Sequence, residues 1–441
     1  MKFAGTILFL LLFMELFFRI WDGHTRQVHQ REKAGARLVL ALLLILGLLI
    51  GILEGALRYG TLILLLGLQA GLAFLSVVRH NKHKGNDESD EGSPYKAWKQ
   101  NLRLAGALML YLISLAPAFL FPQYHLPANT GSHEVACALY TWTDADRLET
   151  YADDGSHRKV TFQVFYPADE GSYPLVLFSH GATGMIESNI STCENLASNG
   201  YIAVSVGHPY QAIMVQDTSG QVTTIDPEFL NNVLTDNGSD SSEHNRKVYE
   251  QSRQWLAVRT GDVNFVLDTI LDRHDAGDDI FRMIDTDHIG LFGHSLGGAT
   301  AVAVGRERSD ISAVIDLEGT MFGEYEGYAD NQYIYNETPY PVPLLDVNSG
   351  WLYEEARNYI GQQYVNFYVG EHAVDFHEAV FENAGHLNYT DLPLVSPILA
   401  DILGSGSVDP LQCLENVNEM VLDYFNHYLK GIPELSIRDV Y

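Results

Sequence analysis

Ser295 stands between glycines where the sequence changes from an apolar run to a stretch of small residues. The segment DHIGLFGHSLGGATAVAVG, residues 287–305, contains the apolar run Ile289–Phe292, then Gly-His-Ser-Leu-Gly, then residues compatible with a helix. A serine hydroxyl is a weak nucleophile that needs a neighbouring base and an exposed, fixed position. A sharp turn from strand to helix supplies that position, and the flanking glycines leave room for it. The pattern predicts that Ser295 is a nucleophile; the alternative is a serine that only caps the helix.

A second apolar run predicts the oxyanion hole. The segment LVLFSHGATG ends in His180-Gly181-Ala182, the kind of loop that donates a backbone N–H to a developing oxyanion. We expect the two donors to be the N–H groups of Ala182 and of Leu296, the residue after the serine. His180 is expected to shape this loop, because the base follows the nucleophile in the chain order of such sites.

The base must therefore come from the C-terminal part of the chain. The candidates are His372, His377, His386 and His427. His377 falls in an expected strand and His427 in an amphipathic helix. His386, in ENAGHLNYTDL, falls in a loop directly after a strand, where an imidazole can reach the serine. We expect His386 to be the base.

The acid has three candidates. Asp316 and Glu318 lie at the end of the strand that follows the elbow helix, in SAVIDLEGTMF, and Asp346 lies in PLLDVNSG. Glu318 is nearer the carboxyl tip of its strand, the edge at which such sheets hold their sites. Position in the order serine, acid, histidine favours Glu318 and leaves Asp316 and Asp346 as alternatives.

The elements that position these residues alternate in type. Several apolar runs, such as PLVLFS and YIAVSV, are apolar throughout, as expected for strands covered on both faces. The first two expected strands are closely joined and predict an antiparallel edge on a mostly parallel α/β sheet. The polar segment 212–243 is expected to be a loop or partial lid. The expected strands are Glu134–Thr141, Lys159–Tyr166, Pro174–Ser179, Tyr201–Val206, His288–Phe292, Ile311–Leu317, Val342–Val347 and Phe376–Phe381; the expected helices are Glu187–Ser198, His244–Leu271, Leu296–Arg306 and Leu411–Leu429.

The first 125 residues differ in kind from the rest. They contain four apolar blocks, each close to the roughly 20 residues that a helix needs to cross a bilayer. Basic residues gather between the first and second blocks and between the third and fourth, so the positive-inside rule places those loops in the cytoplasm. We expect a multi-pass protein of the cell membrane, anchored by residues 1–125 in the lipid bilayer, with residues 126–441 as an extracytoplasmic domain. The four blocks are Phe3–Phe18, Leu38–Leu57, Tyr59–Val78 and Leu104–Phe121.

Charge divides the chain at the same place. Residues 1–125 carry 13 Lys and Arg against 8 Asp and Glu, whereas the remainder carries 14 against 48. So acidic a domain is a poor partner for nucleic acid. The three cysteines, Cys137, Cys193 and Cys413, leave one over from any disulfide, and free thiols are the alternative. We expect no cofactor and no metal ion at the site.

Taken together, these stretches resemble a known family over residues 130–430. The segments YPLVLFSHGATG, GLFGHSLGGATA, IDLEGTMFG, AGHLNYTDLP and VLDYFNHYLKG are similar to those of plasma-type platelet-activating factor acetylhydrolases and their bacterial esterase relatives, which have the α/β-hydrolase fold. The family's nucleophile falls on Ser295 and its base on His386. Its acid, typically Asp, falls on Glu318, one methylene longer, which keeps Asp316 open.

The resemblance implies a calcium-independent serine ester hydrolase. Substrates of such enzymes include phospholipids with a short or oxidised sn-2 acyl group, and many relatives cleave simple short-chain esters. The alternative is a non-catalytic membrane receptor or scaffold built on the same fold. That alternative predicts a missing nucleophile, base or oxyanion glycine, whereas the sequence has all three.

Overall fold

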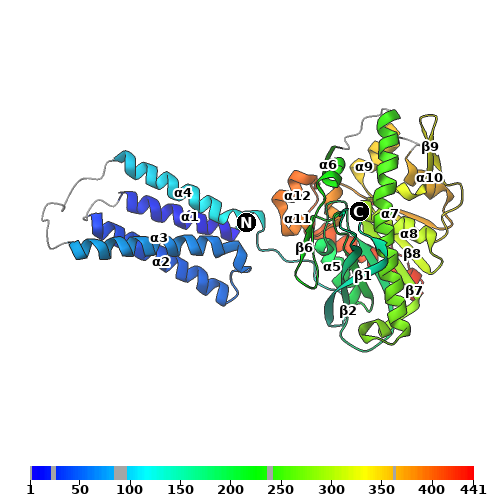
Figure 1. Cartoon of the computed structure of the whole chain (residues 1–441), viewed down its shortest axis with the longest axis horizontal. Helices are drawn as coiled ribbons and strands as arrows, with labels where there is room; N and C mark the ends of the chain where they lie inside the picture. Colours follow the sequence, from blue (N-terminus) through cyan, green and yellow to red (C-terminus); the bar gives the residue numbers. More distant parts are fainter. Residues whose placement is uncertain (1, 21–25, 84–96, 236–241, 361–363) are drawn as a thin grey trace. The chain divides into compact units, whose positions relative to one another are not determined.

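The chain forms two compact units. The computed structural model describes residues 2–20, 26–83, 97–235, 242–360 and 364–441. One unit comprises Met1–His125 with Leu394–Leu399, and the other comprises Leu126–Pro393 with Ala400–Tyr441. Figure 1 shows the helices and strands of each unit.

The second unit is built on an eight-stranded sheet in the order β1-β2-β4-β3-β7-β8-β11-β12. β2 is antiparallel to both β1 and β4, and all the other neighbours are parallel. This confirms the mostly parallel sheet with an antiparallel edge. The strands are β1 (Val135–Leu148), β2 (His157–Pro167), β3 (Tyr173–Ser179), β4 (Ile202–Val206), β7 (Ile284–His294), β8 (Ile311–Leu317), β11 (Leu344–Ser349) and β12 (Phe376–Phe381).

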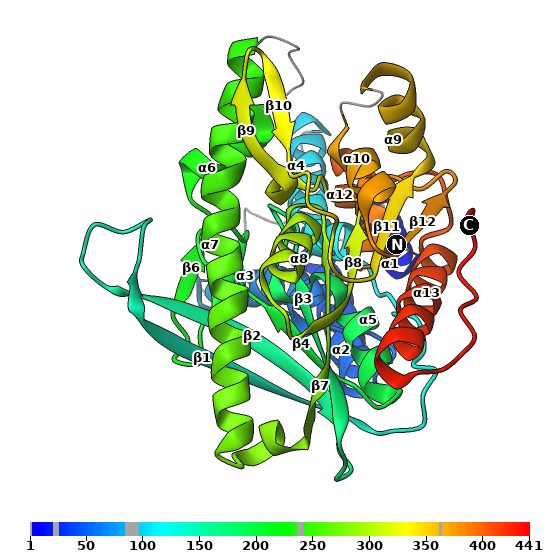
Figure 2. The ribbon, with the colours of Figure 1, turned by 90° about the vertical axis from the view of Figure 1, so that its right-hand side faces the viewer.

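Helices cover both faces of this sheet. In β3, Leu175 and Leu177 pack into one apolar core with α7 and α8, while Val176 and Phe178 pack into a second core with α5 and α13. Alternate side chains of the strand thus enter different cores, which explains why its sequence is apolar throughout. Figure 2 shows α7 and α13 on opposite sides of the strands. The helices are α5 (Ile190–Ser198), α7 (Ser242–Asp275), α8 (Leu296–Glu307), α9 (Gly350–Glu355), α10 (Val365–His372), α11 (Leu392–Val395), α12 (Pro397–Leu403) and α13 (Pro410–Lys430).

The segment expected to be a loop or lid is partly regular. It contains a hairpin of β5 (Met214–Gln216) and β6 (Val222–Thr224), followed by α6 (Pro227–Thr235). A second small hairpin, β9 (Tyr325–Ala329) and β10 (Gln332–Tyr335), follows β8. Residues 236–241, also part of the expected lid, lie outside the described residues.

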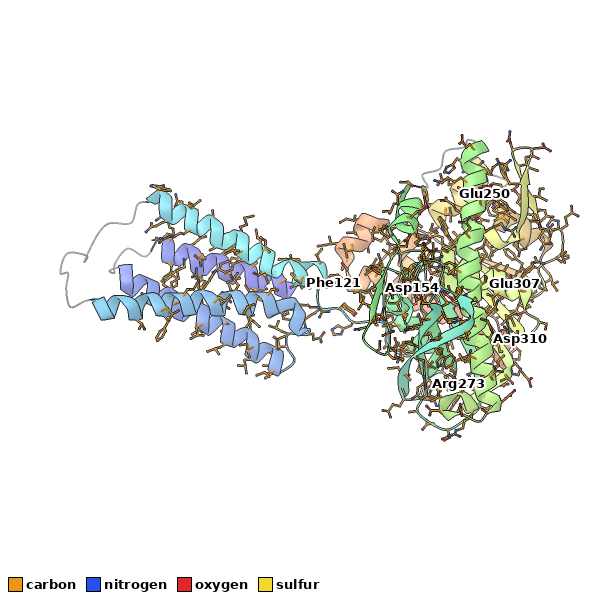
Figure 3. The ribbon with its side chains drawn as sticks, in the orientation of Figure 1. Phe121, Asp154, Glu250, Arg273, Glu307 and Asp310 are labelled. Atoms are coloured by element: carbon orange, nitrogen blue, oxygen red, sulfur yellow. The ribbon has the colours of Figure 1, made fainter. Side chains whose placement is uncertain are left out.

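The surface of this unit carries much of the chain's acidity. Asp154, Glu250 and Glu307 are exposed on different elements (Figure 3). The three cysteines all lie among the described residues, and all are free thiols. The free-thiol alternative therefore holds, and burial raises the pKa of the Cys193 and Cys413 thiols.

In its described residues, the first unit is a bundle of four helices. They are α1 (Lys2–Ile20), α2 (Arg26–Leu49), α3 (Ala56–His83) and α4 (Ala97–Leu120). Leu11, Leu62 and Tyr111 are buried inside the bundle, while large apolar side chains such as Phe13 and Leu64 are exposed on its outside. A bundle that is apolar on its outer faces as well as its inner faces suits a lipid environment better than water.

Only three of the four expected membrane spans are supported. Among the described residues, Lys2–Ile20, Arg58–Leu75 and Gln100–Leu120 are long and apolar enough to cross a bilayer. The second expected block, Leu38–Leu57, does not form one helix. α2 ends at Leu49, and Gly51 and Gly55 both have φ +76°, a left-handed conformation that breaks the helix.

Candidate active site

Ser295 occupies a strained turn between β7 and α8. Its φ is +58° and its ψ is −126°, a conformation that a residue with a side chain rarely adopts. Its N–H donates to the Leu317 carbonyl oxygen at 2.9 Å, which ties the turn to the end of β8. The strand, the turn and the helix are those that the sequence predicts, and they expose the hydroxyl at the carboxyl edge of the sheet.

The glycines beside this serine are required by close backbone contacts. A Cβ on Gly293 would lie 2.1 Å from the carbonyl oxygen of Gly297. A Cβ on Gly297 would lie 1.9 Å from the carbonyl oxygen of Ser179, at the end of β3. Neither position has room for a side chain, because α8 approaches β3 with only backbone between them.

The structure brings the predicted site residues into one cavity of about 680 Å³. Ser295, His386, Glu318, Ala182 and Leu296 all line it. His386 Nδ1–H donates to Glu318 Oε2 at 3.1 Å, which leaves Nε2 as the nitrogen with a free lone pair. The His386 side chain is 44% exposed, whereas that of Glu318 is 2% exposed. The arrangement is a solvent-facing imidazole held by a buried carboxylate.

The backbone directs Glu318 toward this histidine. Glu318 follows the last residue of β8 and has φ +56°, so its side chain does not follow the alternation of the strand. Its other oxygen, Oε1, accepts from the Ser349 N–H at 3.1 Å and from the Ser349 hydroxyl. These bonds fix the carboxylate at the ends of β8 and β11.

The two alternative acids lie elsewhere. Asp316 is fully buried, and its Oδ1 accepts from the Gly319 N–H at 2.8 Å. Asp346, its partner across β8 and β11, accepts from the side-chain amides of Asn348 and Asn366. Burial raises the pKa of both carboxyls, and Asp346 raises that of Asp316 further. Neither lines the cavity that holds Ser295.

Arg259 of α7 holds the loop that carries Ala182. It is fully buried, and its guanidinium donates to the carbonyl oxygens of His180, Gly181 and Gln211. The C=O and N–H of one trans peptide point in opposite directions. Holding the Gly181 carbonyl toward Arg259 therefore turns the Ala182 N–H away from it. Burial lowers the pKa of Arg259 to about 9, so the side chain is charged at neutral pH.

Two histidines stabilise the same region without being candidate bases. His180 Nδ1–H donates to the Gly181 carbonyl at 2.7 Å, in agreement with its expected role in shaping the loop. His294 Nε2–H donates to the backbone carbonyl of His386 at 2.7 Å, and so links the residue before Ser295 to the loop of the expected base. Burial lowers the pKa of both, that of His294 to about 3, so both rings are neutral.

A second Ser-His-Asp chain is buried beneath the site. Ser179 Oγ lies 2.9 Å from His208 Nε2, and His208 Nδ1 lies 3.1 Å from Asp262 Oδ2. All three residues are at most 3% exposed. Arg158 binds Asp262 through both carboxylate oxygens, at 3.0 and 2.7 Å. These three residues are too deeply buried for a substrate to reach them. Their hydrogen bonds therefore have a structural role and fix the end of β3.

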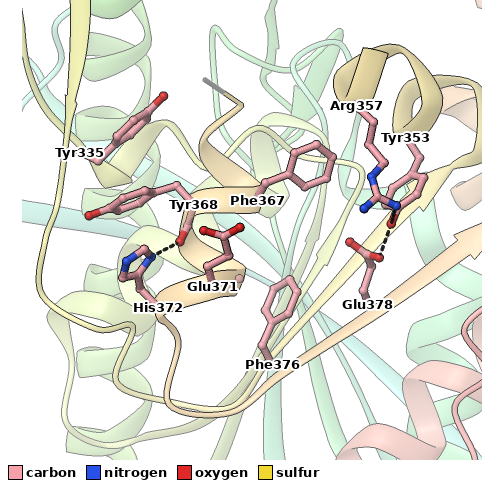
Figure 4. Close-up of a pocket in the computed structure, with 10 residues that line it drawn as sticks. Tyr335, Tyr353, Arg357, Phe367, Tyr368, Glu371, His372, Phe376 and Glu378 are labelled. Carbon is pink, nitrogen blue, oxygen red and sulfur yellow. Dashed lines mark hydrogen bonds between the residues drawn. The ribbon is translucent and has the colours of Figure 1, made fainter. Parts of the chain in front are cut away.

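Another cavity of this unit, of about 700 Å³, has a different lining. Tyr335, Tyr368 and His372 stack along one side of it, and Glu371 and Glu378 point into it from α10 and β12 (Figure 4). α9 contributes Tyr353 to this cavity, whereas Trp351 and Leu352 of the same helix line the cavity of Ser295. The residues that line it include no serine or cysteine. His372, one of the four candidate bases, lines this cavity and not the cavity of Ser295.

Comparison with known proteins agrees with the fold. The family model for platelet-activating factor acetylhydrolase, isoform II, matches residues 159–434, which include Ser295, Glu318 and His386. The chain belongs to the platelet-activating factor acetylhydrolase family. This confirms the resemblance seen in the sequence and makes the chain a member of a family of ester hydrolases.

Two individual relatives are similar over parts of the chain. A probable 1-alkyl-2-acetylglycerophosphocholine esterase from Arthroderma benhamiae is 26% identical over 201 residues, which are 45% of this chain and 43% of that protein. The chain thus matches less than half the length of this acetylhydrolase relative. A ferulic acid esterase from Streptomyces cinnamoneus superposes with a TM-score of 0.54 at 19% identity, over 70% of this chain and 95% of its own. That likeness concerns the fold alone.

Proposed function

We propose that the chain hydrolyses carboxylic esters by two-step acyl transfer, with Ser295 as nucleophile, His386 as base and Glu318 as the acid that orients the base. One observation carries the proposal. His386 Nδ1–H donates a hydrogen bond to Oε2 of the buried Glu318, with Nδ1 and Oε2 3.1 Å apart, and both residues line the same cavity as the strained Ser295. Family membership supports the reaction class.

In the first step, His386 Nε2 takes the proton of the Ser295 hydroxyl while Oγ attacks the ester carbonyl carbon. The carbonyl oxygen becomes an oxyanion and accepts from the N–H groups of Ala182 and Leu296. Leu296 is the first residue of α8, so its N–H has no acceptor within the helix and is available to the substrate. The imidazolium then protonates the leaving alkoxide, and the acyl group stays on Ser295.

In the second step, His386 takes a proton from water, which attacks the acyl-enzyme and releases the acid. The imidazolium returns its proton to Ser295 Oγ. Glu318 stays ionised throughout, because its role is to fix the ring and balance the imidazolium charge. A neutral His294 holds the His386 backbone during both steps.

The substrate that we propose is an ester with a short acyl group, including the short or oxidised sn-2 chain of a phospholipid. The cavity walls are apolar at Val233, Trp255 and Phe322, and Trp351 at its mouth is 71% exposed. The similar protein from Arthroderma benhamiae is named a probable 1-alkyl-2-acetylglycerophosphocholine esterase, and this name supports a phospholipid as substrate. We further propose that residues 1–125 anchor the protein in the cell membrane with the catalytic unit outside. This orientation requires α2 to cross the bilayer together with the three candidate spans, so that both basic loops lie in the cytoplasm.

The test is an acyl-length series with the full chain in detergent or nanodiscs. Acetyl, butyryl, octanoyl and palmitoyl esters of one alcohol are compared, and then 1-alkyl-2-acetyl and long-chain phosphatidylcholines. The proposal expects kcat/KM to fall by at least tenfold from acetyl to palmitoyl in both sets. A preference for long acyl chains would contradict the substrate class, and hydrolysis of none would contradict the activity.

A further inference from the structure

The backbone around His386 decides where its imidazole lies. The side chain is 44% exposed, so packing alone does not fix the ring. Glu318 binds Nδ1, but the distance from Nε2 to Ser295 also depends on the position of the His386 backbone. On one side of this residue, His294 holds the His386 carbonyl oxygen at 2.7 Å. A second bond is needed on the other side, where Gly385 precedes the base.

The side chain of Asn388 supplies this second bond. Asn388 is 1% exposed and belongs to the short 3₁₀ turn His386–Tyr389. Its Oδ1 accepts from the Gly385 N–H, with oxygen and nitrogen 2.8 Å apart, and from the Gly406 N–H at 2.6 Å. One buried oxygen therefore joins the residue before the base to Gly406, which lies 18 residues beyond Asn388 in the chain.

Both segments that this oxygen joins line the cavity of Ser295. The lining residues that they contribute are Gly385, His386, Gly404, Ser405 and Gly406. The two backbones are in close contact, since a Cβ on Gly385 would lie 2.4 Å from the Gly404 carbonyl oxygen. Because no side chain separates them, a shift of one segment displaces the other.

The surroundings determine which atom of the Asn388 amide faces the two glycines. Both glycines present N–H donors, so the acceptor oxygen must face them, and the reverse orientation would set Nδ2 against two donors. Nδ2 is buried and has no hydrogen-bond partner among the described residues. A buried donor without a partner is destabilising. This cost points to a role for the oxygen other than stability.

Other bonds hold the chain beyond the turn. The Asp391 carboxylate accepts from the Ser191 N–H at 3.0 Å, and Asn189 Nδ2 donates to the Tyr389 carbonyl oxygen at 2.6 Å. These bonds fix the later part of the loop to the start of α5. The position of the chain before the base is left to Asn388.

We propose that Asn388 is a positioning residue for the base. Its side-chain oxygen and the bond from His294 hold the chain on both sides of His386, so that Nε2 stays within reach of Ser295. The same oxygen holds the segment 404–406 of the cavity wall at a fixed distance from the base. Asn388 is not among the described residues that line the cavity, so it acts through His386 and not on the substrate. This role rests on the proposed function.

The test compares variants of Asn388 in the full chain by kcat and KM for a soluble acetyl ester at pH 7. Asn388→Ala removes the acceptor of two buried N–H groups. A misplacement of about 1 Å can cost about 10²-fold in rate, so we expect kcat to fall at least about tenfold while KM changes less than about threefold. Asn388→Asp keeps an acceptor oxygen at the same place and should bring kcat to within about threefold of the wild type.

Asn195→Ala is the matched control. Asn195 is also buried, and its Oδ1 accepts from the Thr130 N–H and hydroxyl, both at 2.9 Å, but it lies in α5 and outside the cavity. This variant should lose stability in thermal unfolding and keep kcat within about twofold. Hydrogen–deuterium exchange should rise in both 383–391 and 402–408 in Asn388→Ala, and in neither segment in the control.

Each contrary result has a definite meaning. Unchanged kcat in Asn388→Ala, or an equal fall in Asn388→Asp, would end the case for a positioning role. If Asn388→Ala does not fold, Asn388→Ser makes the same comparison, because its shorter side chain cannot reach both N–H groups. A wild type that hydrolyses no ester would overturn the proposed function, and with it the role of Asn388. An active wild type with unaffected variants would overturn the positioning role alone.

Discussion

Arg259 offers a sharp test of how the oxyanion hole is positioned. Its guanidinium donates to three carbonyl oxygens and, through Nε, to the Gln211 side chain at 2.8 Å. Arg259→Lys keeps the charge but replaces a planar fork by a single ammonium group, which cannot reach both His180 and Gly181 as well as Gln211. The Gly181–Ala182 peptide then loses its fixed direction.

The size of the effect follows from the donor that is misaligned. Complete loss of one oxyanion donor costs about 2.7–4 kcal/mol. In Arg259→Lys the Ala182 N–H is still present but points in a less favourable direction. We expect this to raise the activation free energy by roughly half of that amount, which lowers kcat by about 10- to 30-fold. KM for a soluble acetyl ester should change less than about threefold, because the donor acts mainly in the transition state.

The assay is kcat and KM of the full chain at pH 7, with thermal unfolding of the same preparations. Arg306→Lys is the matched control, because Arg306 is also a part-buried fork, bound to Glu324 at 2.8 Å through Nε, but lies outside the cavity of Ser295. That variant should lose stability and keep kcat within about twofold. If Arg259→Lys keeps full kcat, or if both variants lose kcat in proportion to stability, the positioning argument is refuted.

Three further predictions concern the acid, the buried chain and the elbow. Glu318→Gln should lower kcat by about 10³- to 10⁴-fold, whereas Asp316→Asn, at a buried carboxyl that does not line the cavity of Ser295 and whose pKa burial raises, should leave kcat within about threefold in the same assay. Asp262→Asn should cost about 1.5–3 kcal/mol in denaturant unfolding at pH 7, because the buried Arg158 loses its charge-assisted hydrogen bonds to Asp262 and keeps the one to Glu149. Burial alone would raise the pKa of Asp262, but Arg158 holds it well below the ordinary value. This stabilisation is therefore present above about pH 4 and fades as pH falls, so the difference between wild type and variant should shrink on acidification; a constant difference would count against it. Gly297→Ala should lower kcat at least tenfold, since its Cβ would meet the Ser179 carbonyl at 1.9 Å; unchanged kcat would show that the elbow tolerates the shift.

The sequence was sufficient for features that depend on local pattern. The elbow at Ser295, the loop at Ala182 and the loop at His386 each follow an apolar strand, and the structure places all three around one cavity. The parallel sheet was predictable because alternate side chains of a strand such as β3 enter different apolar cores.

Features that depend on tertiary contacts were not predictable. Arg259 belongs to a long, polar helix, and from the sequence an arginine in such a helix is expected to lie on the surface. Only the tertiary packing buries it against the loop that carries Ala182. Glu318 faces His386, and Asp316 does not, because Glu318 has a positive φ directly after β8. A glutamate in the sequence does not predict this backbone conformation. The second apolar block looked like a span because hydropathy averages across Gly51 and Gly55, where the helix breaks.

Labelling by a fluorophosphonate probe tests the central claim most directly, since such probes bond only to an activated serine in an accessible site. We predict stoichiometric labelling of the full chain at Ser295, complete loss of labelling and esterase activity in Ser295→Ala, and retained labelling in Ser179→Ala, whose hydroxyl is buried and bound to His208. Labelling or near-normal ester hydrolysis by Ser295→Ala would contradict it.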